Sequence, residues 1–144
     1  MSDELLTLLP FILVVGLALV VILVDLFWPK RDDLIMGISI GGLFVALAAT
    51  LVIGPLPGDL GLLTDAGAIG DPSLYTRDLL TALLDVALIS IGLLTLMFAP
   101  DYLAPRKLPL AEFSATLIFA VSGGMLVAGG QDLLILFIGL ELLV

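Results

Sequence analysis

The sequence predicts an all-α integral membrane protein, a polytopic bundle of transmembrane helices with four full spans and the start of a fifth. Hydrophobic residues make up 61% of the 144 residues and charged residues 13%, against about 25% charged residues in a soluble domain. The apolar residues form runs of about twenty, the length that spans a bilayer core as a helix. These runs lack the strict alternation of barrel strands, which excludes a transmembrane barrel.

The charge of the chain and the residue types that it lacks limit the partners and the chemistry that it can have. With 5 basic and 14 acidic residues the net charge is −9, which argues against a nucleic-acid partner or a strong attraction to anionic lipid. Cysteine and histidine are both absent from the sequence, which excludes disulfides, cysteine-ligated iron–sulfur clusters and histidine-ligated metals. We therefore expect no metal ion or cofactor in this chain, and any chemistry is left to carboxylates, backbone and packing.

The first two expected helices are residues 5–28 and 34–53. The first follows an acidic N-terminus and is too long for the apolar part of a signal peptide, so we expect a retained helix and no cleavable signal. It ends before Pro29, and the adjacent tryptophan suits the membrane–water interface. The second helix carries no charge and ends at the Gly54-Pro55 breaker.

The other three expected helices are residues 78–98, stopped by Pro100, residues 110–128, and the incomplete run 133–144. The last run reaches about 18 Å as a helix, and the hydrocarbon core is about 30 Å thick. We therefore expect residues 1–144 to be a single transmembrane domain and a fragment of a longer membrane protein. The alternative is a half-buried tail that packs against a partner.

The distribution of positive charge predicts the orientation of the chain. Four of the five basic residues lie in two loops, residues 29–33 and 99–109: Lys30, Arg31, Arg106 and Lys107. The other loops hold only Arg77. Cytoplasmic loops carry an excess of Lys and Arg, so these two loops are expected in the cytoplasm and the N-terminus outside.

Small residues at helical spacing mark two candidate helix interfaces. Gly37 and Gly41 form a GxxxG pair in the second helix, and Ala120, Gly124 and Ala128 form a stripe in the fourth. Such positions let two helix backbones approach closely. The alternative for both is chance spacing in a chain rich in glycine and alanine.

Three acids inside the expected helices are candidates for chemistry, because ionisable residues in a membrane are costly and often functional. Asp25 lies near the end of its helix, where solvent explains it. Asp85 lies about 10 Å inside the third helix, and Thr81, one turn earlier, is placed to hydrogen-bond its carboxyl. We favour a neutral, hydrogen-bonded Asp85 that faces other helices over a functional one.

Glu141 is the strongest of the three candidates. It lies nine residues beyond Asp132, about 13.5 Å inward and close to the bilayer midplane, among apolar neighbours. Alone it would be protonated, whereas a lysine from another helix would keep it charged. A midplane carboxylate that exchanges between these states acts as a proton relay. A structural carboxyl bonded to a neighbouring helix is the alternative.

Several segments resemble a known family: Ala111-Glu112-Phe113, Gly123-Gly124-Met125-Leu126, Gln131-Asp132-Leu133 and Phe137-Ile138-Gly139-Leu140-Glu141-Leu142. They are similar to subunit N of the proton-pumping NADH:quinone oxidoreductase, respiratory complex I, one of its antiporter-like membrane subunits. Leu140 stands where the sister subunits L and M carry tryptophan, which favours subunit N. The resemblance covers residues 78–144 well, and residues 1–77 only in helix count and hydropathy.

The resemblance implies a fold of about fourteen transmembrane helices with inverted repeats, of which this chain is the N-terminal part. It implies that Glu141 is the proton-relay glutamate, paired with a lysine outside this fragment. The parent complex implies NAD, FMN, iron–sulfur clusters and quinone, none of them in this chain. It also implies other membrane subunits of complex I and the lipid bilayer as partners, in a bacterial plasma (inner) membrane.

Two other functions stay open from the sequence. One is a subunit of a cation/proton antiporter, a transporter without redox coupling, which neighbouring genes would distinguish. The other is a non-catalytic structural membrane protein, against which the incomplete last helix argues.

Overall fold

A computed structural model describes residues 2–28, 31–53, 79–130 and 132–144. Within these ranges every element is a helix and there is no strand, which confirms the expected fold class. The elements are α1 (Ser2–Phe27), α2 (Asp32–Ile53), α3 (Leu79–Leu103), the 3-10 helix η1 (Ala104–Arg106), α4 (Leu110–Gly129) and α5 (Leu133–Leu143). In this part of the chain 4 helices, α1 to α4, are long and apolar enough to cross a membrane, and α5 is shorter.

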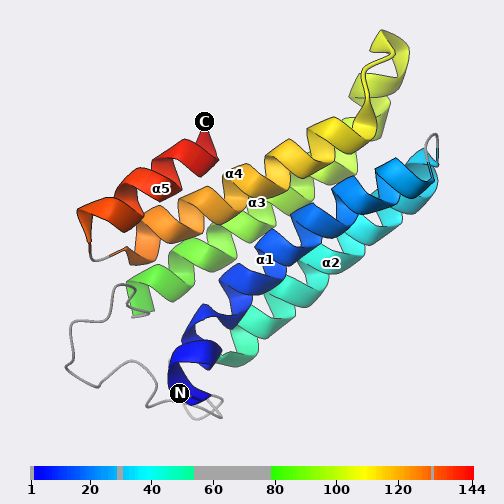
Figure 1. The fold of residues 1–144 in the computed structure, drawn as a ribbon. Coiled ribbons are helices and arrows are strands. Elements are labelled where there is room, and N and C mark those ends of the chain that lie inside the picture. The colour runs from blue at the N-terminus through cyan, green and yellow to red at the C-terminus, as the bar shows by residue number, and fades with distance from the viewer. Residues whose placement is uncertain (1, 29–30, 54–78, 131) are drawn as a thin grey trace.

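The long helices run up and down beside one another. Figure 1 shows α1 and α3 ending at the same end of the bundle where α2 and α4 begin. α5 starts at the opposite end and runs back along the second half of α4. α4 contacts each of the other α-helices, whereas α5 contacts α4 and no other described element. α4 is therefore the centre of the bundle, and α5 is attached to it from outside.

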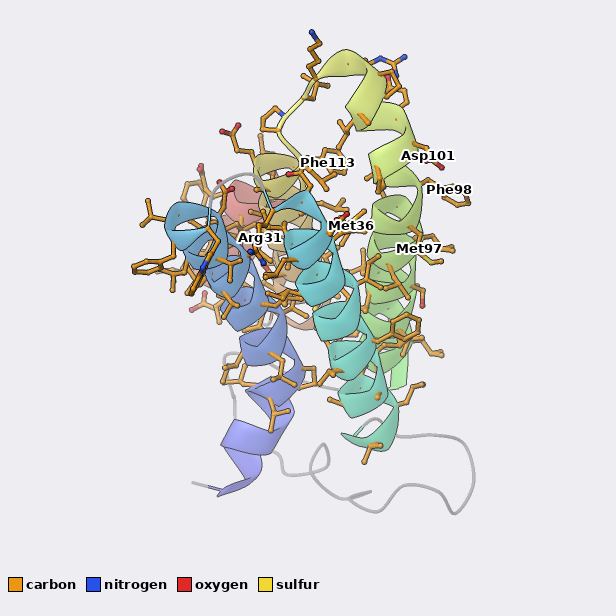
Figure 2. All side chains as sticks on the ribbon, turned by 90° about the vertical axis from the view of Figure 1, so that its right-hand side faces the viewer. Arg31, Met36, Met97, Phe98, Asp101 and Phe113 are labelled. Atoms are coloured by element: carbon orange, nitrogen blue, oxygen red, sulfur yellow. The ribbon has the colours of Figure 1, made fainter. Side chains whose placement is uncertain are left out.

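The bundle has an apolar core and an apolar exterior. Its core joins residues of the four long helices, among them Val14, Leu43, Ile89 and Ile118, all of them fully buried. Large side chains such as Met97 and Phe98 project outward from α3 (Figure 2) and are exposed. Exposed apolar surface of this extent would be a liability in water but suits contact with lipid.

Four hydroxyl side chains in the long helices donate a hydrogen bond within their own helix. Ser39, Thr50, Thr95 and Thr116 each donate to the carbonyl oxygen four residues earlier, at 2.7 to 2.8 Å. Polar groups in a membrane need internal partners, because lipid offers none. These residues are therefore compatible with the long helices being membrane spans.

The end of α3 differs from the expectation that Pro100 stops the helix. α3 continues through Pro100 to Leu103, and η1 follows. Ala99 and Leu103, on either side of the proline, are buried against Leu110 of α4, with Met36 packed beside them. Proline removes one backbone hydrogen bond but fixes a helical φ, and packing of this kind stabilises the turn beyond it.

The two stripes of small residues behave differently. Gly37 and Gly41 are exposed, and a methyl group added at either would meet nothing within 4 Å, so the GxxxG pair makes no helix contact in the described part of the chain. In α4, a Cβ on Gly124 would lie 3.0 Å from the side chain of Leu88 in α3. The stripe in α4 thus contacts α3, whereas the pair in α2 faces no other helix in the described part of the chain.

The described residues of the two basic loops, 31–33 and 99–109, lie at one end of the bundle. Arg31, before α2, and Asp101, near the end of α3, are at the same end in Figure 2. Arg106 stacks on the ring of Tyr102, with its guanidinium carbon 3.7 Å from the ring centroid, and donates to the Tyr102 carbonyl at 2.9 Å. Lys30, Arg77 and the long connection 54–78 lie outside the described residues.

Candidate proton-transfer site

The candidate site begins with the turn that leads into α5. Asp132 caps this helix: its carboxylate accepts a hydrogen bond from the backbone N–H of Leu134 at 3.4 Å, and its carbonyl accepts from Leu136 at 3.0 Å. A carboxylate at this position satisfies one of the free N–H groups of the first turn and complements the helix dipole. The cap fixes where α5 begins and therefore how far along it Glu141 lies.

Glu141 lies eight residues after the start of α5, about 12 Å along the helix axis. Every other residue of α5 is apolar or glycine, so this is the one ionisable side chain of the helix. Its side chain is exposed, while Gly139, two residues earlier, is buried against α4. Two residues correspond to about 200° around a helix, so Glu141 lies on the face turned away from α4.

The described cations lie far from this carboxylate. Arg31 lies at the start of α2, and Arg106 and Lys107 follow α3, at the end of the bundle opposite to the start of α5. No ion pair of Glu141 with these residues is therefore possible in the described part of the chain. The face that carries Glu141 instead exposes Leu133, Leu134, Phe137 and Leu140, an apolar surface around one carboxylate.

Two glycines set the distance between α4 and α5. A Cβ built on Gly123 would lie 2.6 Å from the backbone N of Leu143 and 2.7 Å from the carbonyl oxygen of Gly139. A Cβ built on Gly139 would lie 2.9 Å from Cγ2 of Val127 and 3.1 Å from the carbonyl oxygen of Gly123. The two backbones are thus in direct contact, which only glycine permits on both sides.

Asp85 lies on α3, which packs against a different face of α4 from α5, and is 1% exposed. It lies between Thr81, whose hydroxyl donates to the Ala128 carbonyl at 3.4 Å, and Leu88, which packs at Gly124. These contacts place Asp85 on the face of α3 that meets α4. The expectation that it faces other helices is confirmed, and a hydrogen bond between Thr81 and its carboxyl stays a prediction.

The remaining acids are less suited to chemistry within the bundle. Asp25 is half-buried two residues before the end of α1, and Glu112 is exposed in the first turn of α4. In the described part of the chain no group of three or more Asp and Glu side chains is arranged to hold a metal ion. Asp85 is the one carboxylate that is buried among the residues whose burial is described, and Glu141 is the one ionisable side chain of α5.

The sequence did not single out Gly139, which the structure places at the closest contact of α5. It is the one small residue in an otherwise bulky apolar helix, and it is the one buried residue of that helix. A lone glycine among large apolar residues of a membrane helix indicates a close backbone approach, and this signal could have found it.

Comparison with known proteins gives one consistent answer. No family model matches the chain. A protein named NADH-quinone oxidoreductase subunit N from Leptospira biflexa is 31% identical over 144 residues, which are 99% of this chain and 28% of that protein. The protein of the same name from Chloroflexus aggregans is 36% identical over 136 residues, 93% of this chain. Over nearly its whole length the chain is thus similar to part of proteins named NADH-quinone oxidoreductase subunit N.

The similarity to these proteins extends over nearly the whole chain. It therefore includes residues 1–77, where the resemblance in the sequence had rested on helix count and hydropathy alone. A protein named NAD(P)H-quinone oxidoreductase subunit 2 from Synechocystis is also similar, at 31% identity over 95% of this chain. The chain spans about a quarter of the length of the curated relatives that it matches.

Proposed function

We propose that this chain belongs to a membrane subunit of an NADH-quinone oxidoreductase and that Glu141 takes part in proton translocation by that subunit. The names of its relatives support the first part. The observation that supports the second is the position of Glu141, a single carboxylate on the outer, apolar face of α5. A carboxylate is costly in such surroundings and is a functional candidate for that reason.

The proposed mechanism is electrostatic. Glu141 pairs with a lysine from outside the described residues, and the protonation of each group depends on the charge of the other. Quinone reduction elsewhere in the complex separates the pair. Without the positive charge beside it Glu141 takes up a proton, and without the carboxylate the lysine releases its proton to a water-lined path. When the pair forms again, Glu141 gives up its proton and the lysine takes up another. The electron carriers of the complex (NAD, FMN, iron–sulfur clusters and quinone) belong to other subunits, and this chain supplies the carboxylate.

The proposed setting is the inner membrane of a bacterium, with the loops 29–33 and 99–109 in the cytoplasm and the N-terminus outside. The support is the excess of basic residues in these two loops, which lie at the same end of the bundle. Other membrane subunits of the complex are the expected partners. The relatives are named quinone oxidoreductases, which favours this assignment over a free-standing cation/proton antiporter.

The experiment that tests this function replaces Glu141 with glutamine in the full-length subunit. Glutamine keeps the size and hydrogen bonding of glutamate but cannot ionise. We expect the complex to assemble and reduce quinone while fewer protons are pumped per electron, because loss of an acid–base group slows proton transfer by roughly 10²–10⁴-fold. Glu112→Gln is the matched control, because Glu112 is the same residue type in an exposed helix end, and we expect it to pump normally.

Both outcomes of this test are measured on inverted membrane vesicles, as acidification against quinone reduction. Normal proton pumping by the Glu141→Gln variant would remove the role given to Glu141. Equal losses in the Glu141→Gln and Glu112→Gln variants would point to a general effect of charge, and would also contradict the proposal.

A further inference from the structure

We infer that Gly123 and Gly139 are positioning residues for Glu141: their backbone contact fixes the rotation of α5 and thereby the direction in which the carboxylate points. This inference rests on the proposed function of Glu141. Neither glycine has a reactive group. The inference gives both of them a role in proton transfer, beyond a contribution to the stability of the fold.

The contact between α4 and α5 leaves no room for a side chain at Gly123, because backbone atoms lie on both sides of it. The atoms nearest to a Cβ on Gly123 belong to the main chain of α5: the N of Leu143, the O of Gly139 and the C of Leu142, all within 2.6 to 2.9 Å. Real Cβ atoms do not come so near to other atoms. A side chain could turn aside, but helix backbone moves only if the whole helix moves.

The contact lies beside the proposed proton-transfer residue in the sequence and in space. Gly139 precedes Glu141 by two residues, and the main chain of Leu142 and Leu143, which follow it, also meets Gly123. α5 thus touches α4 just before and just after Glu141. The carboxylate is held between these two points on the opposite face of the helix.

Few other contacts in the described part of the chain orient α5. Its N-terminus is fixed by the Asp132 cap, and α4 is its one neighbour among the described elements. A methyl group at residue 123 would therefore push the second half of α5 outward and carry Glu141 with it. Misplacement of a reacting group by about 1 Å costs about a hundredfold in rate in well-studied enzymes.

The neighbouring residue provides a matched control. Gly124 is also buried and also in α4, but the three atoms nearest to a Cβ there all belong to the Leu88 side chain of α3, the first at 3.0 Å. Gly41 in α2 provides a second control, since a Cβ there would meet nothing within 4 Å. All three glycine-to-alanine changes add one methyl group to a helix.

The experiment uses the full-length subunit in the assembled complex, with Gly123→Ala, Gly124→Ala and Gly41→Ala made separately. For each variant we measure assembly, quinone reduction, protons pumped per electron, and the infrared carboxyl stretching band of Glu141, assigned by its loss in Glu141→Gln. We expect Gly123→Ala to assemble and reduce quinone, to pump about tenfold less, and to shift the carboxyl band. We expect both controls to leave pumping and the band unchanged.

Three results would overturn the inference. The first is normal pumping with an unshifted carboxyl band in Gly123→Ala, and the second is the same loss and band shift in Gly124→Ala. The third is failure of both Gly123→Ala and the milder Gly139→Ala to assemble, because the contact would then serve folding alone. Normal pumping by Glu141→Gln contradicts the proposed function instead, so the two failures are distinguishable.

Discussion

Asp85 and Glu141 are two carboxylates of the same bundle with opposite surroundings. Asp85 is 1% exposed and lies between α3 and α4, whereas Glu141 is exposed on the outer face of α5. Both lie at a similar level along α4. Asp85 lies between the residues that contact Ala128 and Gly124, and Glu141 lies between those that contact Val127 and Gly123.

The difference teaches that depth in a helix does not by itself distinguish an acid enclosed by neighbouring helices from one that is turned away from them. Asp85 is about 9 Å and Glu141 about 12 Å from the start of its helix, which is too similar to separate them. What separates them is the face of the helix. Asp85 is enclosed by the described helices, and Glu141 is turned away from them, where it is available to another group.

The comparison predicts that loss of Asp85 affects stability more than pumping. Asp85→Ala removes a buried polar side chain from the α3–α4 contact and leaves a space behind. We expect the free energy of unfolding to fall by about 1–3 kcal/mol, with the protons pumped per electron unchanged in the complexes that assemble. Thermal unfolding of the purified complex in detergent and the vesicle assay measure these two effects.

Asp85→Asn sharpens the same test. The amide keeps the volume and most hydrogen bonds of a protonated carboxyl, so we expect this variant to be more stable than Asp85→Ala and to pump normally. If Asp85→Asn assembled but failed to pump, Asp85 would be a second proton-transfer group, and the contrast between the two acids would no longer hold.

A smaller effect is expected at Thr81. Its hydroxyl donates across the helix interface to the Ala128 carbonyl, so Thr81→Val removes one hydrogen bond between α3 and α4. Such bonds contribute about 0.6 kcal/mol in membrane bundles, which predicts a small fall in Tm. Thr116→Val is the control, because Thr116 donates within its own helix. An equal fall in Tm for both variants would contradict a specific role of Thr81 at this contact.

Much of the fold could be predicted because each long helix corresponds to an apolar run in the sequence, with a helix-breaking residue near its end. The expected ranges 34–53 and 110–128 match α2 and α4 to within two residues at each end. This works because backbone in lipid must bond internally, so that an apolar run of this length has one stable form. The predicted end of α3 was wrong because packing around Pro100 outweighs the tendency of proline to end a helix.

The contacts between helices were harder to predict. Spacing shows which small residues share a face of a helix, but not whether another helix covers that face. Gly37 and Gly41 have the ideal spacing and make no contact in the described part of the chain, whereas Gly123 and Gly139 lie in different helices and touch. That pairing depends on the register between α4 and α5, and the turn at Asp132 sets this register. The spacing of residues within a single helix cannot predict it.

The sequence could predict which residue is the candidate for proton transfer, but not the direction in which its side chain points. One acid in an apolar run marks Glu141 without any structure. The Glu141 side chain points away from α4 because Gly139 packs against α4. Only the structure shows this contact.

The most direct test of the account is whether Glu141 changes its protonation during turnover. Infrared difference spectroscopy of the assembled full-length complex, recorded before and after quinone reduction, reports the carboxyl stretching band of a protonated acid. We predict a band that appears or disappears on reduction, that shifts in heavy water, and that is absent from Glu141→Gln but present in Asp85→Asn. A spectrum unchanged by Glu141→Gln would contradict the proposal that this carboxylate carries a proton.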